Sequence, residues 1–340
     1  AKQGQGGSRG PMTDAWRHVF ARFGGFIEHL RPTASERCDA LAAAADVAHC
    51  LRSHFRPLDE LLAGGFPGAG ESDHLIIGGH GKGTAIRPAD TIDVLYVLPA
   101  NLRSENRPAT GGRSLGLELA AVLGERFSDI TQAAEGWLAV RPGGEVPRRS
   151  AAVRLIPCFP RHPAEESSAF LVADPGSATA WRVIDPAAER ARLEAADAAS
   201  GNKASHLILM LKAWRRARRI DIGALALELL VTDFVSVWTY HRRGLLFYDW
   251  MVRDFFFWLR FQRDRAVPIP GSPELLAVGG SWLAAANDAY GTAKTACLLE
   301  RDNAGDDALG YWETIFGAAF AESQGEPPAP VPRIGLAAAS

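Results

Sequence analysis

A change in hydrophobic periodicity along the chain limits the folds that it can adopt. Apolar residues recur at helical spacing over residues 16–55, with a break at Arg31-Pro32-Thr33, and again over residues 185–320. Between these stretches lie short β-branched runs that are bounded by glycine or proline, at residues 74–77 and 92–98. The sequence therefore predicts an α+β fold in which helices precede and follow a small sheet.

The lengths of the remaining periodic segments complete this prediction. Residues 114–127 have a helical pattern, whereas 137–140 and 152–157 are too short for helices and are predicted as strands. We therefore expect a core sheet of four or five strands. Later helices are predicted over residues 187–199, 206–219, 222–239, 247–260, 283–299 and 307–320.

These elements suggest two domains between two less structured ends. Residues 12–185 are expected to hold the N-terminal helices and the sheet, and residues 186–322 a helical lobe. Residues 323–340 are rich in glycine, proline and alanine and are expected to form a loose tail. The polar stretch 1–11 is interpreted as an added leader and is left out of the fold prediction.

Composition restricts the class of protein. The chain has 340 residues, a formal net charge of −2, 47% hydrophobic and 22% charged residues, which excludes whole-chain disorder and a polybasic nucleic-acid arm. The four cysteines are far apart and never form CxxC, so neither a disulfide framework nor a zinc site is indicated and a reducing cytoplasm fits best. No apolar run is long enough to predict a membrane span.

The segment from Ile77 to Pro99 carries the strongest functional signal. It combines a strand end, the pair Gly78-Gly79, a basic loop with Lys82, and a second strand that bears Asp93. In such an arrangement, backbone N–H groups can approach triphosphate oxygens while the acid holds a metal ion. A glycine-rich hairpin with a solvated lysine is the plainer interpretation of the same pattern.

Further motifs give the segment a family resemblance. The chain resembles the CD-NTases, the cGAS/DncV-like nucleotidyltransferases of bacterial antiphage signalling, whose signature is a hydrophobic residue, Gly-Gly or Gly-Ser, a spacer, and acid-x-acid. Residues 82–88, Lys-Gly-Thr-Ala-Ile-Arg-Pro, match the spacer of that family. The other matches are Leu155-Ile156-Pro157-Cys158-Phe159, Asp174-Pro175-Gly176, Trp181, Asp185-Pro186, Leu211-Lys212-Ala213-Trp214-Arg215, Trp312 and Ile315-Phe316-Gly317.

The resemblance implies a polymerase-β-like nucleotidyltransferase core with a small mixed sheet, a helical C-terminal lobe, and nucleotides bound in the interlobe cleft. Members of the family use two magnesium ions to join nucleoside triphosphates into cyclic di- or trinucleotides, which activate a separate cell-killing effector. The residues expected to bind nucleotide are Gly78, Gly79, His80, Lys82, Thr84 and Lys212. Lys212 also fits a solvated basic helix face, and His80 a solvent-exposed loop.

Two of the three metal-binding carboxylates that the resemblance implies are replaced in this sequence. The acid pair falls on Thr91 and Asp93, and the third acid position is Arg154. A guanidinium cannot lose its proton in a protein and cannot bind magnesium. We therefore expect Asp93 to be at most a lone metal ligand, no bound cofactor, and an ion pair between Asp93 and Arg154 on adjacent strands.

Three functions fit these observations. The first is a pseudoenzyme of cyclic-oligonucleotide signalling, which binds a nucleoside triphosphate or cyclic nucleotide and pairs with an effector or with an active nucleotidyltransferase. The second is an active magnesium-dependent synthase, in which a one-residue bulge moves Asp90 next to Asp93. The third is a nucleic-acid-responsive scaffold that uses basic, aromatic helices, although the near-neutral charge argues against a nucleic-acid partner.

Overall fold

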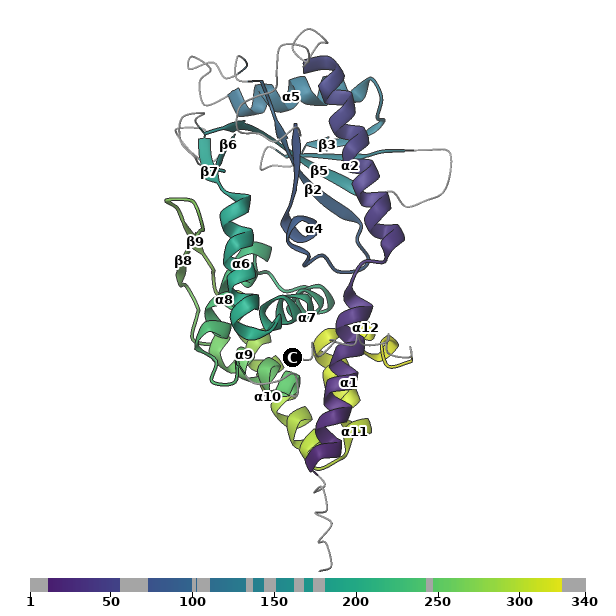
Figure 1. The fold of residues 1–340 in the computed structure, drawn as a ribbon, viewed down its shortest axis with the longest axis vertical. Helices are drawn as coiled ribbons and strands as arrows, with labels where there is room; N and C mark the ends of the chain where they lie inside the picture. The colour runs from purple at the N-terminus through teal and green to yellow at the C-terminus, as the bar shows by residue number, and fades with distance from the viewer. Residues whose placement is uncertain are drawn as a thin grey trace, which may run out of the picture. The chain divides into compact units, whose positions relative to one another are not determined.

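The computed structural model describes residues 12–55, 73–99, 102, 111–132, 137–143, 151–161, 168–173, 181–242 and 247–325 (Figure 1). The chain divides into two compact units. Pro32–Ala195 and Ala266–Leu276 form the first, here named the core unit, and Ala1–Arg31, Ala196–Arg265 and Ala277–Ser340 form the second, the helical unit. The leader 1–11, the turn 174–176 and the tail beyond residue 325 lie outside the described residues.

A mixed sheet of seven described strands is the centre of the core unit. The strands are β1 (His74–Ile77), β2 (Thr91–Val97), β3 (Asp129–Gln132), β4 (Leu138–Arg141), β5 (Ala152–Pro160), β6 (Phe170–Ala173) and β7 (Trp181–Ile184). Their order is β1-β2-β5-β4-β3, and β6 pairs with both β5 and β7. The pair β2–β5 is parallel, and the other neighbouring strands are antiparallel.

The expected number of four or five strands is therefore wrong. The strands β3, β6 and β7 are missing from the prediction, and each has only four residues. In β3, with the sequence Asp-Ile-Thr-Gln, three of the four side chains are exposed, so no apolar run marks it as a strand. The strands β6 and β7 do carry apolar residues, but with four residues each they depend on pairing with β5 and with each other.

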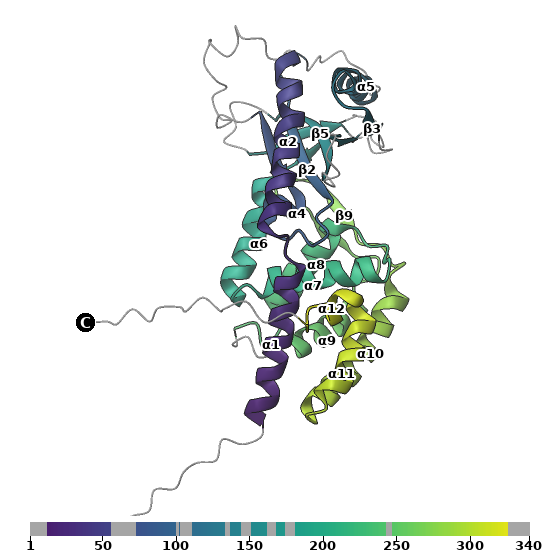
Figure 2. The ribbon, with the colours of Figure 1, turned by 90° about the vertical axis from the view of Figure 1, so that its right-hand side faces the viewer.

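Alternation along β2 and β5 separates a helix-covered face of the sheet from a second face. Ile92, Val94 and Tyr96 lie in one core with α2 (Ala34–Phe55) and α5 (Gly111–Gly124). Figure 2 shows α2 running along the sheet. Leu95 and Val97 form a second, smaller core with Ile156 and Cys158. Because side chains alternate along a strand, Thr91, Asp93 and Arg154 lie on the face of this second core.

The break predicted at Arg31-Pro32-Thr33 is confirmed. The first helix, α1, spans Met12–Leu30, and α2 begins at Ala34. Thr33 and Glu36 cap the start of α2 reciprocally: the Glu36 N–H donates to Thr33 Oγ1 at 3.1 Å, and the Thr33 N–H donates to Glu36 Oε2 at 2.7 Å. This capping box satisfies two backbone N–H groups that no helical carbonyl can reach.

The helical unit is packed around buried aromatic side chains. Phe23 and Phe26 of α1 contact Phe316 and Phe320, and Phe23 also contacts Trp312. This packing explains why α1 belongs to the helical unit, whereas the predicted boundary placed it with the sheet. The other helices of the unit are α7 (Lys203–Ala217), α8 (Ala224–Val237), α9 (Tyr248–Leu259), α10 (Leu283–Arg301), α11 (Gly305–Phe316) and α12 (Ala318–Glu322).

One predicted helix is divided in the structure, whereas the helix predicted over 187–199 is present. The segment predicted as one helix over 307–320 is two helices, because Gly317 has a φ of 79° and interrupts the helical conformation. The bounds of α6 are Pro186–Ser200, and the helix crosses from one unit into the other. Among the described helices, none is both long enough and apolar enough to span a membrane.

A hairpin that the sequence pattern did not predict belongs to the core unit. It consists of β8 (Ala266–Pro268) and β9 (Leu275–Ala277), although it lies within the expected helical lobe in sequence. Gly271 has a φ of 72°, and a Cβ atom there would lie 2.3 Å from Cβ of Asp185. Asp185 caps α6 through its Oδ1, which accepts the Ala188 N–H at 2.9 Å. The hairpin therefore packs on the start of α6.

Candidate functional site

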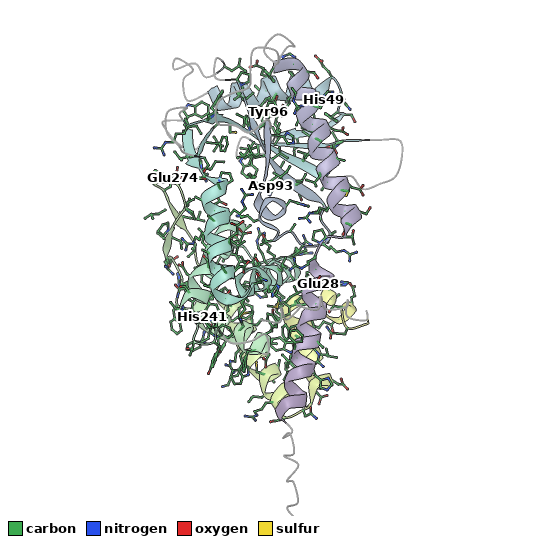
Figure 3. The ribbon with its side chains drawn as sticks, viewed as in Figure 1. Glu28, His49, Asp93, Tyr96, His241 and Glu274 are labelled. Atoms are coloured by element: carbon green, nitrogen blue, oxygen red, sulfur yellow. The ribbon has the colours of Figure 1, made fainter. Side chains whose placement is uncertain are left out.

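The glycine-rich segment after β1 forms a single helical turn, α4 (Gly78–Lys82), in place of the open loop that the sequence predicts. Gly78 has a φ of 60°, and a Cβ atom at this position would lie 2.3 Å from Oδ2 of Asp93. The glycine therefore allows the carboxylate to lie directly against the backbone. Figure 3 shows Asp93 on β2 beside α4. The turn ends where the Thr84 N–H donates to the Gly79 carbonyl at 2.8 Å.

The predicted ion pair between Asp93 and Arg154 is present. The two residues are register partners on the parallel strands β2 and β5, and Arg154 Nε donates to Asp93 Oδ1 at 2.5 Å. The guanidinium also lies over the Trp137 ring, with its carbon 5.3 Å from the ring centroid. The Arg154 side chain is 47% exposed. A cation on the chain itself thus lies where the resemblance implies an acid for a metal ion.

Asp90 and Thr91 do not complete an acidic pair with Asp93. The β2–β5 register is continuous from Thr91 opposite Ala152 to Val97 opposite Cys158, so the bulge that would turn Asp90 toward Asp93 is absent. Asp90 precedes β2 and is exposed, and its Oδ1 accepts a hydrogen bond from the Thr91 hydroxyl at 3.1 Å. Its backbone carbonyl accepts the Ala152 N–H at 2.8 Å, which fixes this approach to the strand.

The donor set does not fit a two-magnesium centre. Two divalent ions need several converging carboxylates, because oxygen ligands must hold each ion and offset the mutual repulsion of the pair. Among the described residues, no three His, Cys, Asp or Glu side chains come together as a metal site. A guanidinium ~4 Å from a divalent ion would cost about 8 kcal/mol at an effective dielectric constant of 20, twice the unit-charge value.

Lys82, expected to bind phosphate, has a carboxylate partner within the core unit. Its Nζ lies 2.9 Å from Oε2 of Glu189 on α6, and its side chain is only 8% exposed. Arg87 in the following loop pairs with Glu36, with a nitrogen–oxygen distance of 3.2 Å. Thr84 is fully buried, and His80 is half-buried in α4. Of the predicted nucleotide-binding residues, Gly78, Gly79, His80, Lys82 and Thr84 therefore come together around one turn of chain.

Lys212 lies on α7 in the helical unit, whereas the cluster around α4 belongs to the core unit. Its Nζ lies 2.7 Å from Oε1 of Glu228 on α8, and both side chains are largely buried. The second predicted phosphate-binding lysine therefore also has a glutamate partner. Arg216, Arg218 and Arg219, at the end of α7, are exposed, as expected for a solvated basic surface.

Three residues that the prediction did not include define these pairs: Trp137, Glu189 and Glu228. Glu189 is 107 residues from Lys82, and the contact depends on how α6 packs beside α4. Trp137 immediately precedes β4, and its position over Arg154 follows from the β4–β5 pairing. Neither pairing can be inferred from a local pattern, because both depend on strand and helix placement.

Comparison with known proteins identifies the fold. No protein-family model matches the chain, and no curated protein matches it in sequence. CdnC from E. coli MS115-1 has been solved with ATP and also in a complex with HORMA-deltaN. The ATP structure superposes on this chain with a TM-score of 0.64 and 14% sequence identity, and the match covers 89% of this chain and 98% of CdnC. Vibrio cholerae DncV, in its 3′-deoxy GTP bound form, has a TM-score of 0.60 and 13% identity, covering 90% of this chain and 97% of DncV.

A third structure extends the comparison. The STING-associated CdnE c-di-GMP synthase from Capnocytophaga granulosa has a TM-score of 0.56 and 9% identity, covering 84% of this chain and 85% of CdnE. At these identities the likeness concerns the fold, since one fold supports different functions. The chain therefore has the cGAS/DncV-like fold of the CD-NTases, with a polymerase-β-like nucleotidyltransferase core and a helical C-terminal lobe.

Proposed function

We propose that this chain is a pseudoenzyme of bacterial antiphage signalling by cyclic oligonucleotides. It binds a nucleotide at the part of the core unit formed by α4, Asp93 and Arg154, and it has lost metal-dependent nucleotidyl transfer. The chain then acts by binding a protein partner, which is either an effector or an active nucleotidyltransferase. The fold supports a nucleotide as the class of ligand, and the side chains of the site support the loss of nucleotidyl transfer.

The Asp93–Arg154 ion pair is the main observation that supports the proposed loss of activity. Magnesium-dependent transfer requires carboxylates that hold two ions against the attacking and leaving oxygens. Here the one acid at the expected strand position accepts a hydrogen bond from a guanidinium, and the adjacent alternate position is a threonine. A threonine hydroxyl and a guanidinium supply no negative charge to replace the missing ligands.

The structural neighbours support the two binding functions. CdnC is described with ATP and DncV with 3′-deoxy GTP, so the same fold binds nucleotides in those proteins. CdnC is also described in a complex with HORMA-deltaN, which makes a protein partner a reasonable component of the proposal. We extend both properties to this chain as a hypothesis to be tested.

Incorporation of radiolabelled nucleotides tests the loss of transfer. The full chain is incubated with each of the four ribonucleoside triphosphates and with their mixture, in magnesium and in manganese, with and without a candidate partner from the same cell. We expect no linear or cyclic product under any condition. Product formation by the unaltered chain, abolished in both Asp90→Asn and Asp93→Asn, would support the active alternative and overturn the proposal.

A further inference from the structure

The charged side chains around α4 form neutral pairs within the chain. Lys82 pairs with Glu189, Arg87 with Glu36, and Arg154 with Asp93. Among the described residues, each of these three cations thus has a carboxylate partner, and the exposed Asp90 adds a further acid next to β2.

Such a neighbourhood is poorly suited to a triphosphate. A nucleoside triphosphate carries several negative charges, and sites that bind it supply metal ions, lysines, arginines or a glycine-rich run of N–H groups to balance them. The donor set described above does not fit magnesium, and Lys82 and Arg87 each lie against a glutamate. A ligand with few charges would meet less repulsion here.

The same part of the sheet offers a flat surface to a base. The Arg154 guanidinium lies over Trp137 and has nearly half of its side-chain area exposed. Trp137 in turn packs against the small core of Leu95, Val97 and Ile156. Aromatic rings and guanidinium planes are the surfaces on which unpaired bases stack in proteins, because both present flat, weakly hydrated faces.

From the charge balance and the stacking surface we infer that this site takes a nucleobase ligand of low charge, such as a nucleoside or a nucleotide with a single phosphodiester, in preference to a magnesium-bound triphosphate. The inference rests on the proposed nucleotide-binding function and specifies its ligand. Base stacking on the Arg154 guanidinium, which Trp137 supports, supplies the affinity, while Glu189 and Glu36 hold the neighbouring cations and deny them to additional phosphates.

Calorimetric titration of the full chain tests this preference. The probes are adenosine, guanosine, cyclic 3′,5′-AMP, cyclic 3′,5′-GMP, ATP and GTP, each at physiological salt with magnesium and with a chelator. We expect the nucleosides or cyclic nucleotides to bind at least as tightly as the triphosphates, with magnesium changing the affinity of the nucleosides and cyclic nucleotides by less than about twofold because no ion bridges ligand and site.

A variant of Glu189 isolates the role of charge. In Glu189→Gln the carboxylate that holds Lys82 is removed, and the affinity for ATP relative to adenosine should rise by about fivefold, which corresponds to about 1 kcal/mol. Glu194→Gln is the matched control, because Glu194 lies on the same helix with its side chain 71% exposed. That control should leave the ratio unchanged. Thermal melts of both variants establish that they are folded.

The outcomes separate the inference from the function on which it rests. If magnesium-bound ATP or GTP binds the unaltered chain tighter than every low-charge probe, the inference is wrong and nucleotide binding stands. If no probe binds in the millimolar range, the proposed nucleotide-binding function also fails. An unchanged ATP-to-adenosine ratio in a folded Glu189→Gln protein would overturn the role assigned to the Lys82–Glu189 pair.

Discussion

Arg154 and Asp93 are directly opposite each other on two parallel strands, and the guanidinium Nε donates to the carboxylate Oδ1 at 2.5 Å. By the family resemblance, Asp93 is the one metal-binding acid that this sequence retains, and Arg154 stands at the position of another. Because the pair is partly exposed, its contribution to the free energy of unfolding is modest, up to about 1 kcal/mol. Its main consequence is chemical: the carboxylate that would hold a divalent ion already has a cation.

The position of Asp93 depends on the absence of a side chain at Gly78. In Gly78→Ala the new Cβ atom would lie 2.3 Å from Asp93 Oδ2, so the carboxylate has to move. A positive φ also disfavours alanine by roughly 1–2 kcal/mol. We expect Gly78→Ala to lower the free energy of unfolding by more than the backbone penalty alone, as measured by urea denaturation.

Gly83→Ala separates the two effects in that experiment. Gly83 has a φ of 70°, close to that of Gly78, but a Cβ atom there would have no neighbour within 4 Å. This variant should show the backbone penalty without the displacement of Asp93. Equal losses of stability in the two variants would show that Asp93 does not lie close enough to Gly78 to be displaced by a Cβ atom.

The buried Lys212–Glu228 pair makes Lys212 important for stability. Removing one partner of a buried pair leaves the other charge in a poorly solvated position, which typically costs about 3–5 kcal/mol. Lys212→Met should therefore destabilise the protein by roughly this amount, and the double variant Lys212→Met/Glu228→Leu should recover much of the loss. Lys294→Met, at an exposed position on α10, is the control and should change stability by less than about 0.5 kcal/mol.

A double-mutant cycle monitored by chemical denaturation measures this coupling. If Lys212 instead serves mainly to bind phosphate, Lys212→Met would leave the free energy of unfolding nearly unchanged and would weaken ligand binding. That pattern of results would contradict the structural role assigned to the pair.

Asp249 in the helical unit should make stability depend on pH. Burial raises the pKa of its carboxyl to about 7, with a further upward contribution from Glu300 and opposing contributions from the N–H of Trp250 and from Arg253. The folded state therefore binds the proton more tightly than the unfolded chain. This difference in proton binding makes the folded state more stable at low pH. The contribution to the free energy of unfolding is fully present below the unfolded pKa near 3.8 and is lost as the pH rises through about 7.

The variant Asp249→Asn removes this titration. At pH 8 we expect Asp249→Asn to melt several degrees above the unaltered protein, because up to about 4 kcal/mol of desolvation penalty is relieved. At pH 5 the difference in melting temperature should be less than half of that at pH 8, and it should vanish only below the unfolded pKa near 3.8. A difference that is independent of pH, or that is larger at pH 5, would show that the carboxyl is not protonated by burial.

Elements with a strong local signal were predictable from the sequence. The capping pattern Thr33-x-x-Glu36 marks the start of α2, and the β-branched run in β2 marks the central strand. The strand β3 carries little apolar character and depends on pairing with β4, whereas β8 and β9 are apolar but have only three residues each, too few for a periodic pattern to mark them as strands. A positive φ at Gly317 likewise splits a helix whose apolar period continues through it.

The candidate site was predictable only in part, for a related reason. The pairing of Asp93 with Arg154 could be foreseen, because the motif positions place these residues on neighbouring strands. The partners of Lys82 and Lys212 could not, because Glu189 and Glu228 reach them through helix packing. Sequence motifs thus point to candidate residues, whereas only the packing shows that Lys82 and Lys212 each lie against a glutamate.

Titration of magnesium into the protein by calorimetry tests the central claim most directly. The unaltered chain is compared with the double variant Thr91→Asp/Arg154→Asp, which restores acids at both substituted positions. We predict no saturable binding to the unaltered chain in the low-millimolar range, with or without nucleotide, beyond the binding of magnesium to nucleotide alone, and saturable binding to the double variant. Saturable magnesium binding by the unaltered chain at such concentrations, lost in Asp93→Asn, would contradict the account.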